Sequence, residues 1–343
     1  MRTCSPSLLT SRLLAFVITT ASKDLKVVST MSAGYDHVQV SALRSRSIKL
    51  GTTPDALTDA TADIGAMLTL MATRRAGEAY RNVIEGKWPT MPWSPFLLCG
   101  SGLQGVSLRC LSAAKLSVEL WADFSPFFRV VVGPFIANTP NQKTIGILGF
   151  GRIGQLTLKR LLGFSPTKAL YTTSRPGLPP TQDYYSLLPP NLNSAAIEPA
   201  ATIRNLAERS DILIVTCALT EQTKGLVGAE FLGWMKKGSY VINTARGPIV
   251  DNGALVRAVR SGHLAGAGLD VVDGEPNIGH GHELLKEDTI VVLPHIGSAT
   301  VETRDRMGED AVRNLFAALG IAKVEGDTDG NGWDGGWRNQ VQI

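Results

Sequence analysis

The chain has 343 residues, of which 44% are apolar and 19% charged, and its formal net charge at pH 7 is +4. These values are typical of a globular protein of one large or two ordinary domains, and they give no reason to expect a nucleic-acid or membrane partner. The four cysteines, Cys4, Cys99, Cys110 and Cys217, form no C-x-x-C pair. We therefore expect no metal, no disulfide framework and a reducing compartment.

The first 23 residues are ambiguous. They contain basic residues with several Ser and Thr, and the first acid is Asp24. Such a composition is typical of a transit peptide, but an arbitrary, wrongly assigned start would also produce it. The apolar run 13–18 is too short to span a membrane. We expect a cytoplasmic location, with a mitochondrial one as the alternative.

From Leu25 onward the pattern becomes regular. Buried strands are predicted over 26–30 and 48–51, and the apolar spacing predicts a helix from Thr58 to about Arg75. A Pro-rich connection to Gly100 resembles an interdomain link. The segment 105–141 that follows has no clear period, and a lid or docking loop is its functional interpretation.

Residues 143–154 read KTIGILGFGRIG, and an apolar, helix-compatible segment follows at 155–162. A strand, a glycine turn and a helix in this order are typical of a dinucleotide-binding site. Gly149 allows the tight turn, Gly151 lets the backbone approach a pyrophosphate, and Gly154 lets the helix pack closely on the strand. The phosphates are expected at the helix N-terminus. The alternative is a purely structural turn.

The next strand is predicted over 168–173, and its end bears on the choice of cofactor. An acid about 18 residues after Gly154 would hold the ribose 2′-hydroxyl of NAD. The chain instead has Thr172, Thr173, Ser174 and Arg175. Ser174 can hydrogen-bond a 2′-phosphate and Arg175 can pair with it, so we expect NADP(H) to be preferred and NAD(H) to be possible. Alternatively, Arg175 is an ordinary surface residue.

Strands predicted over 212–216, 240–243, 266–271 and 289–293 alternate with helices around 231–235 and 255–261. This alternation predicts an α/β fold with a doubly wound parallel sheet. Ligands of such sheets bind beyond the carboxyl ends of the strands.

Three polar residues follow such strand ends: Arg246, Glu275 and His295. Arg246 can hold a carboxylate, His295 can give a proton as a hydride arrives, and Glu275 can keep the imidazole protonated. Each residue alone could be structural. Together, after a glycine-rich turn, they indicate hydride transfer to a 2-keto acid.

Several long motifs occur in a fixed order: LKVVSTMSAGYDH, GTTPDALTDATAD, WSPFLLCG, IGILGFGRIGQ, LYTTSR, VINTARGPIVD, AGAGLDV, EP and LPHIGSAT. Through them, residues 25–103 and 142–320 closely resemble the D-isomer-specific 2-hydroxyacid dehydrogenases. Within that family the chain is most similar to members that reduce glyoxylate and hydroxypyruvate. The resemblance implies a Rossmann domain inserted into a smaller flavodoxin-like substrate domain.

The resemblance also implies site residues. The implied catalytic set is Arg246, Glu275 and His295. The implied substrate contacts are the backbone N–H groups of Ala33 and Gly34, together with Arg246, Asp270, His295, Ser298 and, from a partner subunit in a homodimer, Trp93. The implied cofactor contacts are Gly149, Gly151, Arg152, Ile153, Gly154, Thr173, Ser174, Arg175, Cys217, Ala218, Thr223, Thr244, Ala245, Asp270 and Gly297.

The expected NAD(P)-binding domain spans 142–298, and the expected substrate domain combines 25–100 with 299–320. Segments 1–24, 105–141 and 321–343 are atypical of the family. By comparison with the family pattern, we expect that this sequence lacks the first strands and helices of the substrate domain, because only two of its strands are recognisable. The Gly- and Asp-rich tail does not resemble a docking segment. Our hypothesis is a faulty gene model, with a missing first exon and an intron retained at 105–141.

Other functions stay open at this point. One is a different 2-hydroxyacid dehydrogenase, such as one acting on phosphoglycerate, although the missing acid argues against its NAD preference. Another is a dinucleotide-sensing binding protein, because transcriptional corepressors of this fold keep the same catalytic trio. A third is an inactive truncated isoform.

Overall fold

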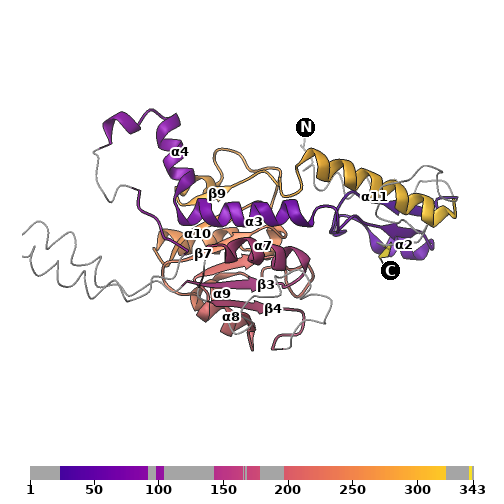
Figure 1. Ribbon diagram of the computed structural model, residues 1–343, viewed down its shortest axis with the longest axis horizontal. Coiled ribbons are helices and arrows are strands. Elements are labelled where there is room, and N and C mark those ends of the chain that lie inside the picture. The colour runs from indigo at the N-terminus through magenta and orange to yellow at the C-terminus, as the bar shows by residue number, and fades with distance from the viewer. Residues whose placement is uncertain are drawn as a thin grey trace, which may run out of the picture.

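Figure 1 shows the computed structural model, which describes residues 24–91, 98–103, 143–164, 166, 168–177, 197–321 and 340–341. The interpretations of segments 1–23 and 105–141, and the expected substrate contact of Trp93, lie outside the described residues.

The larger sheet has seven strands among the described residues, in the order β5-β4-β3-β6-β7-β8-β9. Every neighbouring pair is parallel. The order reverses between β3 and β6, which is where doubly wound sheets bind their ligands. The predicted α/β Rossmann-type fold is therefore confirmed. The strands are β3 (Thr144–Leu148), β4 (Lys168–Thr172), β5 (Ile197–Pro199), β6 (Ile212–Val215), β7 (Ser239–Asn243), β8 (Leu264–Leu269) and β9 (Ile290–Val292).

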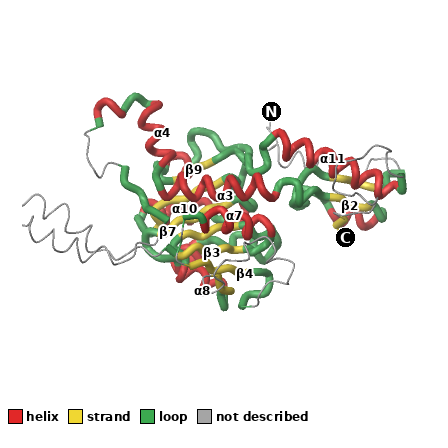
Figure 2. The backbone as a smooth tube through the Cα atoms, in the orientation of Figure 1, coloured by secondary structure: helices red, strands yellow, loops and turns green. Residues whose placement is uncertain are grey.

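Helices cover both faces of this sheet, as a parallel sheet of fully buried strands requires (Figure 2). One face packs against α8 (Ile203–Arg209), α9 (Ala229–Trp234) and α10 (Asn252–Arg260), which contribute Leu206, Phe231 and Leu255 to its core. The other packs against α3 (Thr58–Thr73) and α7 (Arg152–Leu162), through Leu68 and Leu158. Two short 3-10 helices lie between strands of this sheet in the chain: η5 (Gly247–Ile249) follows β7, and η6 (Glu283–Lys286) precedes β9.

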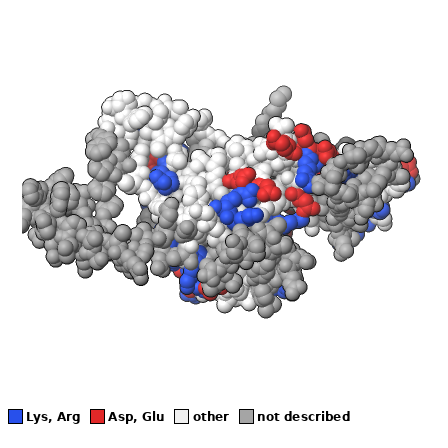
Figure 3. Space-filling view, in the orientation of Figure 1, with Lys and Arg blue, Asp and Glu red and all other residues white. Residues whose placement is uncertain are grey.

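Helix α3 packs against the larger sheet, although the sequence analysis assigned its residues to the smaller domain. Ion pairs on its exposed side reinforce this contact. Arg160 of α7 pairs with Asp59 at 2.9 Å and with Asp63 at 2.5 Å, and Arg152 pairs with Asp55 just before α3. Figure 3 shows acidic and basic side chains lying next to one another near the middle of the view. Beyond α3, α4 (Ala76–Ile84) projects away from the sheet and leads to η1 (Trp88–Thr90).

The smaller sheet contains β1 (Val27–Ser29), β2 (Lys49–Gly51) and β10 (Gln340–Val341), with β2 in the middle. β1 and β2 are parallel, and β10 is antiparallel to β2. Helices α2 (Val40–Ser45) and α11 (Val301–Leu319) pack on it. The sequence indicated two strands and a tail that does not dock. The structure adds a third strand from that tail, because the free edge of β2 offers backbone groups that any extended segment can pair with.

Candidate active site

The glycine turn connects β3 to α7 in the predicted way. Gly149 has φ +100°, and a β-carbon there would overlap with the backbone of Cys217, so only glycine fits. A β-carbon on Gly154 would lie 2.6 Å from the carbonyl oxygen of Gly149. At Gly151 no atom lies within 4 Å of such a carbon. The first and third glycines therefore allow close packing, and the second leaves open space at the N-terminus of α7.

A pocket of about 790 Å³ opens beside this turn, between the ends of β3, β4 and β6. Its described lining contains no acidic side chain. Burial raises the pKa of Cys217 to about 11, so this thiol is an uncharged part of the wall. The predicted cofactor contacts that line the pocket are Gly149, Gly151, Thr173, Ser174, Arg175, Cys217, Ala218 and Thr223. Those that do not are Arg152, Ile153, Gly154, Thr244, Ala245, Asp270 and Gly297.

The loop after β4 forms one wall of the pocket. Its backbone is held by the Thr173 hydroxyl, which accepts from the N–H of Arg175 at 3.1 Å. Arg175 is exposed, and within the described residues its guanidinium has no ion-pair partner. Arg152, also predicted to contact the cofactor, is instead paired with Asp55. Arg175 is thus the basic side chain that the pocket offers to an anion.

His295 and Glu275 form a hydrogen-bonded pair across two loops. His295 follows β9, Glu275 lies in the loop after β8, and Nδ1 of the imidazole is 2.7 Å from Oε1 of the carboxylate. The hydrogen bond to Glu275 raises the pKa of His295 above its ordinary value, against the effect of burial. Burial opposes the ionisation of Glu275, but the hydrogen bonds from His295 and from the N–H of Val272 lower the pKa of the carboxyl group overall.

The backbone of His295 is in the left-handed region, with φ +55°. Such a conformation is unfavourable for histidine and persists only when its surroundings hold it. Asp270, 1% exposed, supplies that support: its carboxylate accepts from the N–H groups of Ile296 at 2.8 Å and Gly297 at 2.9 Å. Its carbonyl accepts from the N–H of His295 at 2.9 Å. Asp270, which we expected to contact ligands, thus holds the loop that carries His295 through both of its carboxylate oxygens.

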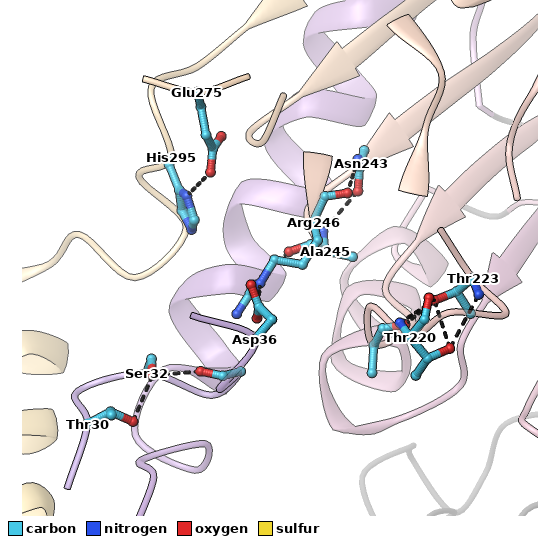
Figure 4. A network of polar contacts seen from close by, with 12 residues as sticks. Thr30, Ser32, Asp36, Thr220, Thr223, Asn243, Ala245, Arg246, Glu275 and His295 are labelled. Atoms are coloured by element: carbon cyan, nitrogen blue, oxygen red, sulfur yellow. Dashed lines mark hydrogen bonds and ion pairs between the residues drawn. The ribbon is translucent and has the colours of Figure 1, made fainter. Parts of the chain in front are cut away.

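Arg246 is positioned by a buried amide. Asn243, at the end of β7, accepts from the N–H of Ala245 and donates to the carbonyl of Arg246, both at 3.0 Å. Gly247 allows the next loop to approach, since a β-carbon there would overlap with the backbone of Val272. The side chain of Arg246 leaves this loop toward the end of β1, as Figure 4 shows.

The loop after β1 meets the Arg246 guanidinium from the other side. Nε of Arg246 donates to Oδ1 of Asp36 at 2.9 Å, and a β-carbon on Gly34 would overlap with Nη2. Ser32 shapes the loop by donating to the carbonyl of Gly34 at 2.7 Å. Gly34, one of the two predicted backbone contacts of the substrate, therefore lies beside Arg246, and Ala33 directly precedes it.

The positive charge of Arg246 acts to lower the pKa of both Glu275 and His295. Arg246, Glu275 and His295 thus lie within electrostatic reach of one another, in the loops that follow β7, β8 and β9. Two further predicted contacts lie nearby in the chain. Ser298 comes three residues after His295. The buried hydroxyl of Thr244 has no hydrogen-bond partner in the described part of the chain.

Sequence reasoning missed two residues of this region, Asn243 and Asp36. Both residues lie inside motifs that the sequence analysis had singled out, VINTARGPIVD and LKVVSTMSAGYDH, so the signal was present.

Within the described ranges, no group of three or more His, Cys, Asp or Glu side chains could hold a metal ion. No described helix is both long and apolar enough to cross a membrane.

Known proteins resemble this chain in sequence and in fold. The sequence model for the D-isomer specific 2-hydroxyacid dehydrogenase NAD binding domain matches residues 133–297. Glyoxylate reductase from Thermofilum pendens is 38% identical over 299 residues, which cover 87% of this chain and 73% of that protein. This chain belongs to the D-isomer-specific 2-hydroxyacid dehydrogenase family.

Two further relatives are similar to this chain. Human glyoxylate reductase/hydroxypyruvate reductase is 35% identical over 303 residues, covering 88% of this chain and 76% of the human protein. The solved NADPH-dependent glyoxylate/hydroxypyruvate reductase from Sinorhizobium meliloti, in complex with NADP and malonate, is 30% identical. Its TM-score is 0.65, and the match covers 90% of this chain and 78% of that one. As a 2-hydroxyacid dehydrogenase, the chain is a reductase with a nicotinamide dinucleotide cofactor.

Proposed function

We propose that this protein reduces glyoxylate to glycolate and hydroxypyruvate to D-glycerate, with NADPH as the preferred reductant. The observation that carries the proposal is the meeting of Arg246 and the His295–Glu275 pair at the strand ends of a sheet that also holds the nucleotide pocket. The names of the human and S. meliloti relatives support the choice of substrates.

Arg246 holds the substrate. Its guanidinium carries a permanent positive charge and donors in one plane, which suits a carboxylate. Nη2 lies against Gly34, so a carboxylate bound there also meets the backbone of the loop after β1. We expect the neighbouring keto group to face His295.

His295 gives the proton. Its Nδ1 is engaged by Glu275, which leaves Nε2 for the keto oxygen. Its raised pKa keeps a protonated population near neutral pH. His37 is the other histidine close to Arg246, but burial lowers its pKa, so it is the poorer acid. The His295 side chain is 49% exposed, so solvent can restore its proton after turnover.

A reduced nicotinamide held in the pocket would supply the hydride that the keto carbon accepts. Hydride at carbon and the His295 proton at oxygen convert the keto group to a hydroxyl group. The turn at Gly149 and Gly151 fits the cofactor, because the open space at Gly151 borders the pocket at the N-terminus of α7. Ser174 and Arg175 line that pocket without an acidic neighbour in its described lining, which favours a 2′-phosphate.

A direct assay tests the proposal. Purified protein is mixed with NADPH and either glyoxylate or hydroxypyruvate, and the loss of reduced-nicotinamide absorbance is followed, with NADH in parallel. We expect turnover of both keto acids and a higher kcat/KM with NADPH. Binding of NADPH without turnover of either acid would instead support the dinucleotide-sensing or inactive alternative.

The cofactor preference gives a first prediction. Replacing Arg175 by alanine should weaken NADPH binding by about 10- to 100-fold, because one charged hydrogen bond to the 2′-phosphate is lost. NADH lacks this phosphate and serves as the matched ligand control, so its dissociation constant should not change. Titration calorimetry measures both. Equal weakening of the two cofactors would show that Arg175 does not select the phosphate.

The Glu275–His295 pair gives a second prediction. Glu275→Gln removes the carboxylate that raises the pKa of His295, so this pKa should fall toward its ordinary value of about 6.5. The acid form of His295 is then lost at a lower pH, and the alkaline limb of the kcat/KM profile should move to lower pH. Glu283→Gln, an exposed glutamate outside the site, is the control. An unmoved alkaline limb would contradict this role of Glu275.

We also propose the expected division into a nucleotide-binding domain and a substrate domain, and a homodimer. Exposed apolar side chains of α4 and η1, namely Tyr80, Val83, Ile84 and Trp88, support a partner surface there. Sedimentation analysis tests the dimer. A cytoplasmic location stays a prediction.

A further inference from the structure

The contact between Asp36 and Arg246 joins the two parts of the molecule. Asp36 lies in the loop after β1 of the smaller sheet, and Arg246 lies in the loop after β7 of the larger one, 210 residues later. Their side chains are 36% and 25% exposed, so the pair lies at the rim of the site and not in a core. Figure 4 shows both side chains in the space between the two loops.

The Arg246 guanidinium is held on three sides. Nε donates to Asp36 at 2.9 Å, Nη1 donates to the carbonyl of Ala245 at 2.8 Å, and Nη2 lies against Gly34. A guanidinium is planar, with five N–H donors in fixed directions. Because Asp36 takes the N–H of Nε and the carbonyl of Ala245 takes one N–H of Nη1, a carboxylate ligand is left with the two N–H groups of Nη2 and the second N–H of Nη1.

We propose that Asp36 is a positioning residue for the substrate: it fixes the plane of the Arg246 guanidinium so that the Nη2 edge faces the incoming carboxylate beside Gly34. The inference rests on the proposed function, in which Arg246 binds the keto acid. Asp36 acts through Arg246 and does not itself touch the substrate.

Two properties of Asp36 can be separated by substitution. Burial disfavours its ionised form, but the charge and hydrogen bond of Arg246 lower the pKa of Asp36 overall, so it is ionised at neutral pH. Its oxygen orients the guanidinium, while its negative charge partly offsets the positive charge that attracts the substrate. Asp36→Asn keeps an oxygen acceptor of nearly the same shape and removes the charge. Asp36→Ala removes both.

The test measures the binding of oxamate, a non-reducible carboxylate isostere of a small keto acid, to the NADPH-bound protein by calorimetry, together with kcat and KM for glyoxylate. In Asp36→Ala we expect oxamate Kd and glyoxylate KM to rise about tenfold, the effect of one lost charged hydrogen bond, with a smaller fall in kcat. In Asp36→Asn both constants should stay within about twofold of wild type. NADPH Kd should not change, because Asp36 does not line the nucleotide pocket.

The control is an ion pair of the same geometry elsewhere. Nε of Arg260 donates to Oε1 of Glu287 at 2.7 Å, away from the site. Glu287→Ala should leave oxamate Kd and glyoxylate KM unchanged. If Asp36→Ala does not fold, Asp36→Ser, which shortens the acceptor, takes its place.

The outcomes separate this inference from the proposed function. Turnover by the wild type with an oxamate Kd that is the same in Asp36→Ala overturns the inference alone. An equal loss of binding in Asp36→Asn and Asp36→Ala also overturns it, because orientation through the retained oxygen would then play no part. Oxamate binding that depends on Asp36 without turnover of either keto acid supports the inference and overturns the proposed function. No oxamate binding by the wild type overturns the inference.

Discussion

Replacing His295 by alanine is expected to lower kcat for glyoxylate reduction by about 10²- to 10⁴-fold, the usual contribution of a positioned general acid. The keto oxygen would then have to take its proton from water while the hydride arrives. The Kd for NADPH should not change, because His295 does not line the nucleotide pocket. Stopped-flow or steady-state loss of NADPH absorbance measures kcat, and fluorescence titration measures the Kd.

The matched control is His280→Ala, which removes an exposed histidine outside the trio and should leave kcat unchanged. The pH profile gives a second criterion. The alkaline limb that reports His295 should disappear in His295→Ala, whereas a small effect on kcat with an intact limb would assign the proton donor to another group.

Replacing Arg246 by alanine is expected to lower kcat/KM for both keto acids by about 10²- to 10³-fold, comparable with the loss of one preorganised donor to a reacting group. The substrate carboxylate would lose its only fixed positive partner in the proposed geometry. Arg246→Lys should recover only part of the activity, because an ammonium keeps the charge and loses the planar donors. Steady-state kinetics at saturating NADPH measure these changes.

Arg260→Ala is the control for this variant, since Arg260 also pairs with a carboxylate through Nε but lies outside the site. Added guanidinium ion offers an independent criterion: partial recovery of Arg246→Ala by this ion is expected if the side chain acts on the substrate directly. A normal KM in Arg246→Ala would move the carboxylate site away from the loop after β7.

The nucleotide half of the fold follows from local sequence patterns. The buried run at β3, the three glycines and the apolar helix α7 are consecutive in the chain, so their spacing alone predicts a dinucleotide turn. β6 and β7 are short apolar runs between turn signals, and they were predicted within one residue of their observed ends. β5 was missed because it has three residues and ends in Pro199, which suits the edge that it occupies. Helix α11 was not predicted, although Thr300 caps it and Gly320 ends it.

The sequence by itself predicted the trio, because Arg246, Glu275 and His295 each follow a strand of a sheet whose ligand sites lie at one end. Only the tertiary structure decided how those residues are held. The partners of Arg246 come from the loop after β1, and the tail strand β10 joins β2 from the other end of the chain. Asp270 proved to hold the histidine loop through its backbone N–H groups. The physical reason is that side-chain and edge hydrogen bonds join residues far apart in sequence, and no local period or spacing records them.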